Sequence, residues 1–200
     1  MKSSIFGTRE HLRIAESIKR LINGERDFLS THTVQSPRAV GDAIQDIICE
    51  SFSDILGERC AEYSKSFARR AMADLAFRGD DGIYYVVDIK THRTDTKFNM
   101  PNLTSVERLA RFYEDDANCF VILMISYGVK ANSLHVTKVH FVPIEFLDWR
   151  CLTIGNLGWG QIQIANSNKL GVNTNFARKK WMIQLCDEML EFYPREISKT

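Results

Sequence analysis

Hydrophobic residues recur every three or four positions in two segments near the start of the chain, residues 8–23 and residues 39–56. This spacing puts the apolar side chains of each segment on one stripe and predicts two amphipathic helices. The polar stretch between them, residues 25–38, includes Pro37 and predicts an exposed loop. The N-terminal part of the chain is therefore expected to pack two helices against a core.

The pattern changes to that of β-strands at residues 72–91. Two runs of β-branched and aromatic residues flank a Gly-Asp-Asp-Gly turn at 79–82, which predicts a β-hairpin. The continuous apolar run at 120–125 predicts a strand buried on both faces, and the alternation over 135–142 predicts a further strand.

Two more helices are expected later in the chain. Thr104, followed by Glu107 three residues later, predicts a capping box at the start of one helix. Residues 176–192 form the other, after a stretch rich in Gly and Asn at 155–175. The order of helices, hairpin, helix, strands and helix predicts an α/β fold, in the sense of an α+β mixed sheet flanked by helices.

The composition argues against several classes of protein. Hydrophobic residues make up 44% and charged residues 26% of the chain, an ordinary globular balance. With no apolar run long enough to cross a bilayer and no secretory signal, a cytoplasmic protein without a membrane partner is expected. The five cysteines are odd in number and far apart, which argues against a disulfide framework or a zinc site. Because the net charge is only +1, a nucleic-acid partner would be held by a local basic cleft.

The residues that could carry chemistry lie in the predicted hairpin. Asp88 and Lys90 are two residues apart in a strand and therefore share one face, while Ile89 points to the other. Asp74 lies near the start of the preceding strand, and antiparallel pairing brings it toward Asp88. Charged groups at the end of an apolar strand cost free energy unless they are paired or used.

Two carboxylates and the backbone carbonyl of Ile89 offer the hard oxygen ligands that Mg²⁺ prefers. A bound Mg²⁺ polarises a phosphodiester oxygen and lowers the pKa of bound water. Lys90, on the same face, can orient that water and stabilise charge on the phosphate. Asp74, Asp88 and Lys90 therefore favour phosphodiester hydrolysis, although an Asp-X-Lys segment by itself is more often a surface salt bridge on an edge strand.

The same residues resemble a known family. Asp88-Ile89-Lys90-Thr91, with Ala73-Asp74 upstream, is similar to the Asp-X-Lys-Thr and proline-aspartate elements of the PD-(D/E)XK nucleases, with alanine where the family has proline. Within that superfamily the chain resembles type II restriction endonucleases. The resemblance extends over 88–110 and returns at 161–163 and Trp181.

This resemblance implies a restriction-endonuclease-like PD-(D/E)XK core and site-specific hydrolysis of DNA. It implies a homodimer that binds double-stranded DNA at a short palindromic site and cuts both strands to blunt ends in a prokaryotic cytoplasm. The implied cofactor is Mg²⁺, with Mn²⁺ as a substitute. Metal binding carries over to Asp74, Asp88 and the Ile89 carbonyl, and the role of catalytic lysine to Lys90.

The helix at 39–56 holds a weaker part of the resemblance. Gly41 to Gln45 is similar to the family's Gly-X-X-X-Glu element, with Gln45 at the place of the glutamate. Glutamine can hold a metal's water but cannot act as a base. Glu50, five residues on, is the alternative accessory residue, and a solvated helix flank is the plainer interpretation of it.

Candidate DNA contacts follow the lysine. Asn and Gln can read adenine, whereas Arg and Lys can hold phosphate. The candidates in and just before the 92–103 loop are Thr91, Arg93, Lys97, Asn99 and Asn102. By resemblance Asn102 contacts a base and Asn99 stands where a relative inserts glutamine between base steps. A merely polar loop remains the alternative for Arg93 and Lys97.

Two further groups of DNA-contact candidates lie near the C-terminus. Gln161 and Gln163 alternate onto one face, which favours a pair of base contacts, with a glycine-rich surface loop as the alternative. Arg178 and Lys179 open the last helix, where cations oppose the helix dipole. They are predicted to face phosphate, and an ordinary solvated helix face is the rival.

Because no repeat or linker interrupts the chain, one endonuclease domain over 1–200 is expected. Its parts are the N-terminal helices (1–56), a catalytic core (57–150) and the recognition loop with the last helix (151–200). Two other functions stay open: a repair or junction-resolving nuclease of the same fold, and a non-catalytic DNA-binding protein. The intact set of Asp74, Asp88 and Lys90 counts against the second.

Overall fold

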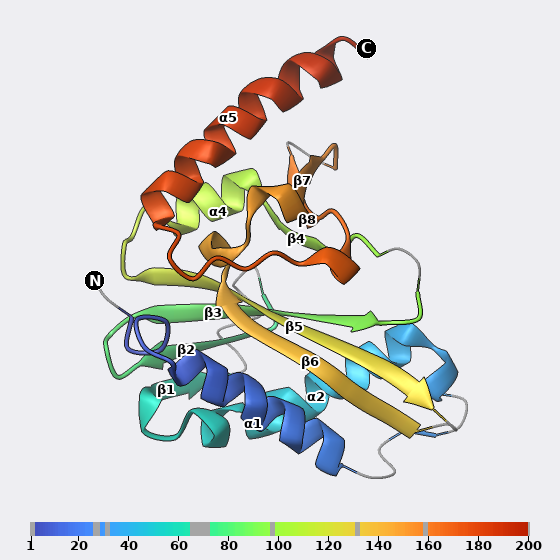
Figure 1. Ribbon diagram of the computed structural model, residues 1–200. Helices are drawn as coiled ribbons and strands as arrows, with labels where there is room; N and C mark the ends of the chain where they lie inside the picture. Colours follow the sequence, from blue (N-terminus) through green and yellow to red (C-terminus); the bar gives the residue numbers. More distant parts are fainter. Residues whose placement is uncertain are drawn as a thin grey trace. The chain divides into compact units, whose positions relative to one another are not determined.

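The computed structural model describes residues 3–25, 29–30, 33–64, 73–96, 99–130, 133–157 and 160–199. Within them, four α-helices accompany a five-stranded mixed sheet and a three-stranded antiparallel sheet (Figure 1), so the predicted mixed α/β class is confirmed. The chain divides into two compact units, Met1–Lys97 with Asp115–Val142, and Phe98–Glu114 with Pro143–Thr200. None of the described helices is long and apolar enough to cross a membrane.

The first unit contains the five-stranded sheet, in the order β1-β2-β3-β5-β6. Strands β1, β2 and β3 pair antiparallel, whereas β3 and β5 run parallel. The elements of this unit are α1 (Glu10–Gly24), the 3-10 helices η1 (Thr33–Gln35) and η2 (Gly57–Arg59), α2 (Pro37–Leu56), β1 (Cys60–Ser64), β2 (Leu75–Gly79), β3 (Tyr84–Arg93), β5 (Asn118–Lys130) and β6 (Ser133–Pro143).

Helices α1 and α2 cover one face of this sheet, as their apolar stripes predicted. Ile18 of α1 and Ile44 of α2 are fully buried, in one core cluster with Val87 of β3 and Val121 of β5. Helix α2 begins two residues earlier than expected, because the Ser36 side chain accepts the Ala39 N–H and Pro37 occupies the first helical position. The alternating positions of β3 therefore divide between this core face and the opposite face.

The β2–β3 hairpin is confirmed, with Leu75 opposite Val87 in the ladder. At its turn, Gly82 has a φ of 78°, which L side chains rarely adopt. The Asp81 carboxylate accepts hydrogen bonds from the Ile83 N–H and the Tyr85 hydroxyl, and so fixes the turn from within. This turn sets the register that carries Asp74 to the Asp88 end of β3.

The second unit contains the three-stranded sheet, in the order β4-β8-β7. Trp149 and Trp181 pack with ring centroids 4.7 Å apart, and the Trp181 Nε1 donates to the Leu147 carbonyl at 2.9 Å, which ties the last helix to the preceding chain. The elements of this unit are β4 (Asn102–Ser105), α4 (Val106–Phe112), the 3-10 helices η3 (Ile144–Phe146), η4 (Trp149–Cys151) and η5 (Ser167–Lys169), β7 (Leu152–Gly155), β8 (Gln161–Ile164) and α5 (Arg178–Ile197).

The predicted capping box of the third helix is wrong by one residue. Thr104 pairs with Ile162 in the β4–β8 ladder, and Ser105 instead accepts the Arg108 N–H as the helix cap. Strand pairing at Thr104, which local sequence does not reveal, competes with the cap. The last helix likewise begins later and ends later than the predicted 176–192.

Candidate functional site

Asp88 is a buried carboxylate in the middle of a parallel strand pair. It lies opposite Ile122 of β5 and is 4% exposed. Its Oδ1 accepts a hydrogen bond from the Lys90 Nζ at 2.7 Å. Its Oδ2 is also buried and has no hydrogen-bond partner in the described part of the chain. A buried carboxylate oxygen without a hydrogen bond costs folding free energy, so this atom is a candidate binding site for a cation or a proton.

The electrostatics of Asp88 agree with that interpretation. Burial raises the pKa of Asp88 to about 7, against the lowering effect of the Lys90 ammonium, and the nearby Asp74 carboxylate raises it further. The Lys90 side chain is 24% exposed and so reaches from the buried carboxylate toward solvent. Asp88 and Lys90 therefore form an ion pair whose carboxylate is buried and whose ammonium is partly exposed. It is not a surface salt bridge on an edge strand, because β3 lies between β2 and β5.

Asp74 lies where the hairpin register predicted it. It directly precedes β2, and its N–H donates to the Val87 carbonyl at 3.0 Å. Its Oδ2 accepts the Ile89 N–H at 2.6 Å, and its Oδ1 accepts the Gln45 Nε2 at 3.1 Å. Two donors from different elements thus hold the Asp74 carboxylate in one orientation beside β3.

The Ile89 carbonyl belongs to the same edge of β3. In a strand, the N–H and C=O of one residue point to the same side, and the Ile89 N–H points to Asp74. Strand β2 begins at Leu75, opposite Val87, and so does not extend as far as Ile89. The carbonyl therefore faces the side of β3 on which the Asp74 carboxylate lies.

The oxygen atoms at this place are of the kind that bind a hard divalent cation. The residues that could hold one are Asp74, Asp88 through its unpartnered Oδ2, and the Ile89 carbonyl, all oxygen ligands of the kind Mg²⁺ and Mn²⁺ accept. Among the described residues there is no group of three or more His, Cys, Asp and Glu that could hold a metal.

Helix α2 supplies a further polar side chain to the site. A Cβ at Gly41 would lie 2.9 Å from the Thr91 Oγ1, so the glycine allows α2 to approach β3 closely. Gln45 follows one turn later and bonds Asp74. Glu50 is exposed and lies five residues on, about 140° around the helix from Gln45. The structure thus brings Gln45, and not Glu50, to the site.

The candidate contacts after Lys90 have different surroundings. Thr91 faces Gly41 on the α2 side of the sheet, opposite to the face of Asp88. Arg93 forms an ion pair with Asp95, in which the Arg93 Nη2 donates to the Asp95 Oδ2 at 2.9 Å. Lys97 lies outside the described residues. Thr91 thus lies against helix α2, and Arg93 has an acidic partner two residues away.

Asn102 and Gln163 are brought together in the second unit. They are direct partners in the β4–β8 ladder, and the Gln163 Nε2 donates to the Asn102 Oδ1 at 2.5 Å. A Cβ at Gly155 of β7 would lie 2.5 Å from the Gln163 Oε1, so the glycine makes room for this amide. Gln161 shares the partly exposed side of β8 with Gln163, as predicted. Sequence reasoning treated the two amides separately and missed their pairing.

The other DNA-contact candidates in the second unit have different surroundings. The Asn99 backbone carbonyl accepts the Ser167 N–H. The Arg178 Nε bonds the buried Glu145 Oε1 at 3.0 Å, and its guanidinium lies 4.2 Å from the Tyr113 ring centroid. This inward pairing removes the main argument for a phosphate contact by Arg178. Lys179 is exposed at the start of α5.

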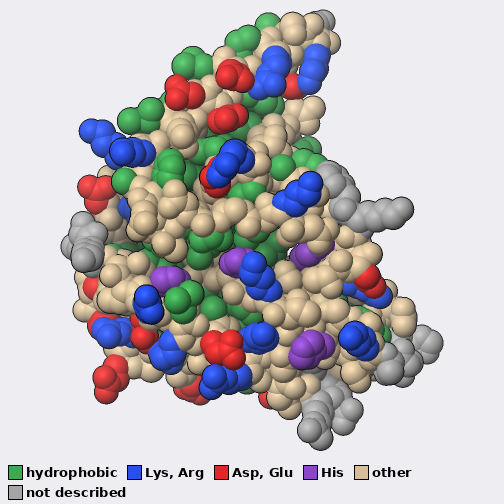
Figure 2. Space-filling view, viewed as in Figure 1, with side chains coloured by type: hydrophobic (Ala, Val, Ile, Leu, Met, Phe, Trp, Pro, Cys, Tyr) green, Lys and Arg blue, Asp and Glu red, His purple; other side chains and the backbone are tan. Residues whose placement is uncertain are grey.

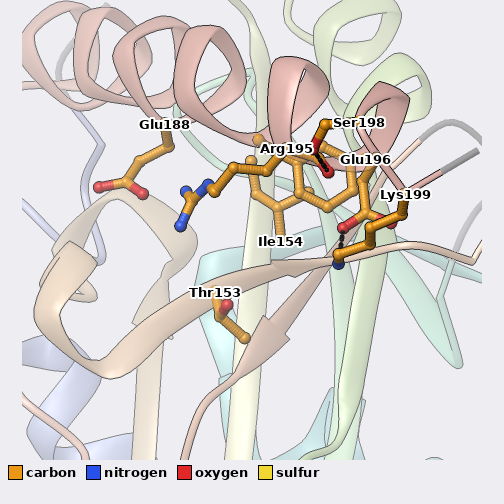
Figure 3. Close-up of a pocket in the computed structure, with 8 residues that line it drawn as sticks. Thr153, Ile154, Glu188, Arg195, Glu196, Ser198 and Lys199 are labelled. Carbon is orange, nitrogen blue, oxygen red and sulfur yellow. Dashed lines mark hydrogen bonds and ion pairs between the residues drawn. The ribbon is translucent and has the colours of Figure 1, made fainter.

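A cavity of about 340 Å³ lies between β7 and the C-terminal half of α5. Figure 3 shows its charged lining, with the Lys199–Glu196 ion pair and the Ser198 hydroxyl bonded to the Arg195 carbonyl. The Arg195 Nε donates to the Glu191 backbone carbonyl at 2.9 Å, and its guanidinium forms an ion pair with the Glu191 carboxylate at 3.6 Å. Because both cations that line this cavity have acidic partners, it is a weaker candidate site than the Asp74–Asp88 pair.

Comparison with protein families and with curated proteins assigns no family to this chain. No protein-family model matches the chain, and no curated protein matches it. The functional interpretation therefore depends on the geometry around Asp74, Asp88 and Lys90 and on the motif they form.

Proposed function

We propose that this chain is a Mg²⁺-dependent endonuclease that hydrolyses phosphodiester bonds of double-stranded DNA. The observation that carries the proposal is the buried Asp88 carboxylate, with one oxygen on Lys90 and the other unpartnered, next to the Asp74 carboxylate. A structural ion pair needs no second carboxylate beside it, and two adjacent carboxylates repel each other unless a cation is shared. Such perturbed carboxylates are typical of functional sites.

Each residue has a distinct role in this proposal. Asp74, Asp88 and the Ile89 carbonyl would hold Mg²⁺, which when bound polarises the scissile phosphate and lowers the pKa of a water molecule. Gln45 keeps Asp74 oriented through its 3.1 Å hydrogen bond. The Lys90 ammonium, anchored on Asp88 but partly exposed, donates to the phosphate and offsets its growing negative charge.

The finer assignment rests on the resemblance. Asp88-Ile89-Lys90-Thr91 and Ala73-Asp74 support a type II restriction endonuclease with a restriction-endonuclease-like PD-(D/E)XK core. On that basis the substrate is a short palindromic site, cut to blunt ends by a homodimer in a prokaryotic cytoplasm. The Asn102–Gln163 amide pair supports sequence reading, because amides form paired hydrogen bonds with adenine.

Digestion of a sequenced plasmid, followed by mapping of the ends, tests the proposal. Discrete fragments whose ends share one palindrome are expected. Nicking confined to mismatches or four-way junctions would instead indicate a repair or junction-resolving nuclease. DNA binding that needs no metal and gives no cleavage would indicate a non-catalytic DNA-binding protein and would refute the proposal.

The choice of metal ion is a sharper expectation. Mg²⁺ and Mn²⁺ should support cleavage, whereas Ca²⁺ should support DNA binding with little or no cutting, because the larger ion orders the attacking water less tightly. Parallel digestions and binding titrations in each ion and in EDTA measure this. Brisk cleavage in Ca²⁺ alone or in EDTA would contradict the two-carboxylate site.

Gln45 allows a test by gain of charge. Gln45→Glu is expected to strengthen Mg²⁺ binding several-fold, because it adds a third carboxylate at the Asp74 side of the site. It should also lower the metal-free free energy of unfolding by about 1 kcal/mol through repulsion of Asp74. Gln35→Glu, the same substitution at an exposed position before α2, is the matched control. Calorimetric Mg²⁺ titration and urea unfolding in EDTA measure the two effects, and equal responses of both variants would exclude Gln45 from the metal site.

A further inference from the structure

Helix α5 buries one apolar stripe and exposes another. Trp181 and Leu185 are 0% and 2% exposed, whereas Ile183, Leu190 and Ile197 are 52%, 74% and 71% exposed. Figure 2 shows hydrophobic side chains along one edge of the region that α5 occupies in Figure 1. Scattered exposed apolar residues are ordinary on a protein surface, but aligned ones indicate an interaction surface.

Four exposed residues of α5 and the half-buried Tyr193 follow the spacing of a coiled-coil seam. We define the outer stripe as Ile183, Cys186, Leu190, Tyr193 and Ile197, which are separated by steps of three and four residues. At 3.6 residues per turn these positions fall within an arc of about 80°. Alternating steps of three and four are the pattern by which one helix packs lengthwise on another. A helix is therefore the kind of partner that fits this stripe.

The outer stripe contains both a projection and a recess. A groove of about 430 Å³ is lined by Cys186, Met189, Leu190, Tyr193, Pro194 and Ile197. Leu190, the most exposed of the large apolar residues among those described, stands at its edge. A two-fold interface must be complementary to itself, and a projecting side chain beside a groove meets that requirement.

The charges on α5 select the orientation of such a pair. The first turn of α5 contains no acidic residue, so nothing there offsets the positive end of the helix. A parallel pair would put two such positive ends together. An antiparallel pair instead puts each positive end beside the C-terminal end of the partner helix, where the one cation of the last turn, Arg195, is already paired with Glu191.

We propose that the outer stripe of α5 pairs antiparallel with the same stripe of a second copy of this chain. The two-fold axis passes between Cys186 and Leu190, so that Leu190 of each copy enters the groove of the other. The pairing does not rest on nuclease activity, and a dimer without cleavage would leave it intact.

Sedimentation of the full chain over a range of concentrations tests the proposal. The wild type is expected to form a species of twice 23.0 kDa. Leu190→Glu should raise the dissociation constant at least about a hundredfold, since two unpaired carboxylates would enter one apolar interface. Gln184→Glu, the same new charge about 120° around the helix, should not change it.

Near-ultraviolet circular dichroism, to which the buried Trp149 and Trp181 contribute, checks that each variant is folded. A wild type that stays monomeric would overturn the proposal, as would a dimer that Leu190→Glu leaves unchanged. A monomer that binds another protein through this groove would overturn it as well.

Cross-linking tests the orientation. In the antiparallel pair Cys186 faces Leu190 of the partner, so Leu190→Cys should form an intermolecular disulfide on mild oxidation, whereas the wild type should not. The other four cysteines are buried or half-buried. A wild-type disulfide through Cys186 would indicate a parallel pair and refute the antiparallel arrangement.

Discussion

Asp88→Asn is expected to abolish plasmid cleavage, with a loss of at least about a thousandfold in rate. The substitution removes the charge of the proposed metal ligand while it keeps the shape of the side chain. Asp54→Asn, at an exposed position on α2, is the matched control and should cut normally. An Asp88→Asn protein that cleaves at the wild-type rate would exclude Asp88 from the site.

The same variant should change the stability of the metal-free protein in a pH-dependent way. Folding raises the pKa of Asp88 from its ordinary value of 3.8 to about 7, mainly through burial. The folded state therefore binds a proton that the unfolded state releases, and the free energy of unfolding falls as the pH rises from about 4 to 7. The loss is on the order of 2–4 kcal/mol.

Asp88→Asn removes this dependence and should be more stable than the wild type at pH 8 in EDTA, but not at pH 5. Added Mg²⁺ should stabilise the wild type at pH 8 and leave the variant unchanged, because ligand binding to the folded state alone raises stability. Urea unfolding at both pH values, with and without Mg²⁺, measures all four cases. A wild type whose stability is flat between pH 5 and pH 8 would contradict the buried, unpartnered carboxylate.

A second large effect is expected at the Asn102–Gln163 pair. Asn102→Ala should weaken binding to the cognate site by about 1–3 kcal/mol, with little change on random DNA, as for a lost base contact. Because Gln163 donates to Asn102, the double variant should lose less than the sum of the two single variants. Binding titrations in Ca²⁺ on both DNAs measure these differences.

Lys179→Ala provides the contrast to that series. Loss of a phosphate contact should weaken cognate and random DNA alike and flatten the dependence of affinity on salt. Equal losses on both DNAs for Asn102→Ala would show that the amide pair does not read bases. An unchanged affinity and salt slope for Lys179→Ala would identify Lys179 as an ordinary solvated side chain.

Local pattern predicted the parts of the site that one hairpin contains. Strand alternation and the Gly-Asp-Asp-Gly turn put Asp88 and Lys90 on one face and brought Asp74 toward the Asp88 end of β3, and the structure has this arrangement. The apolar stripe of α2 likewise predicted its buried face. These features follow from periodicities of two and 3.6 residues and from a short connection.

The contacts that sequence reasoning missed join residues far apart in the chain. Arg178 meets Glu145 across 33 positions, and Gln163 meets Asn102 across 61. The register of β4 against β8 decides the second contact, and no periodic pattern in either strand fixes that register. Both helix candidates, Gln45 and Glu50, stood on the same segment, and only the way α2 packs on β3 distinguishes them.

Gly155 gives this small sheet an evolutionary constraint. Any side chain at residue 155 would begin within 2.5 Å of the Gln163 amide, so a substitution there displaces Gln163 without changing it. Directed evolution would therefore keep residue 155 a glycine for as long as residue 163 is glutamine. A library that randomises residue 155 alone should lose the Asn102–Gln163 amide pair in most clones, although both amides are still present.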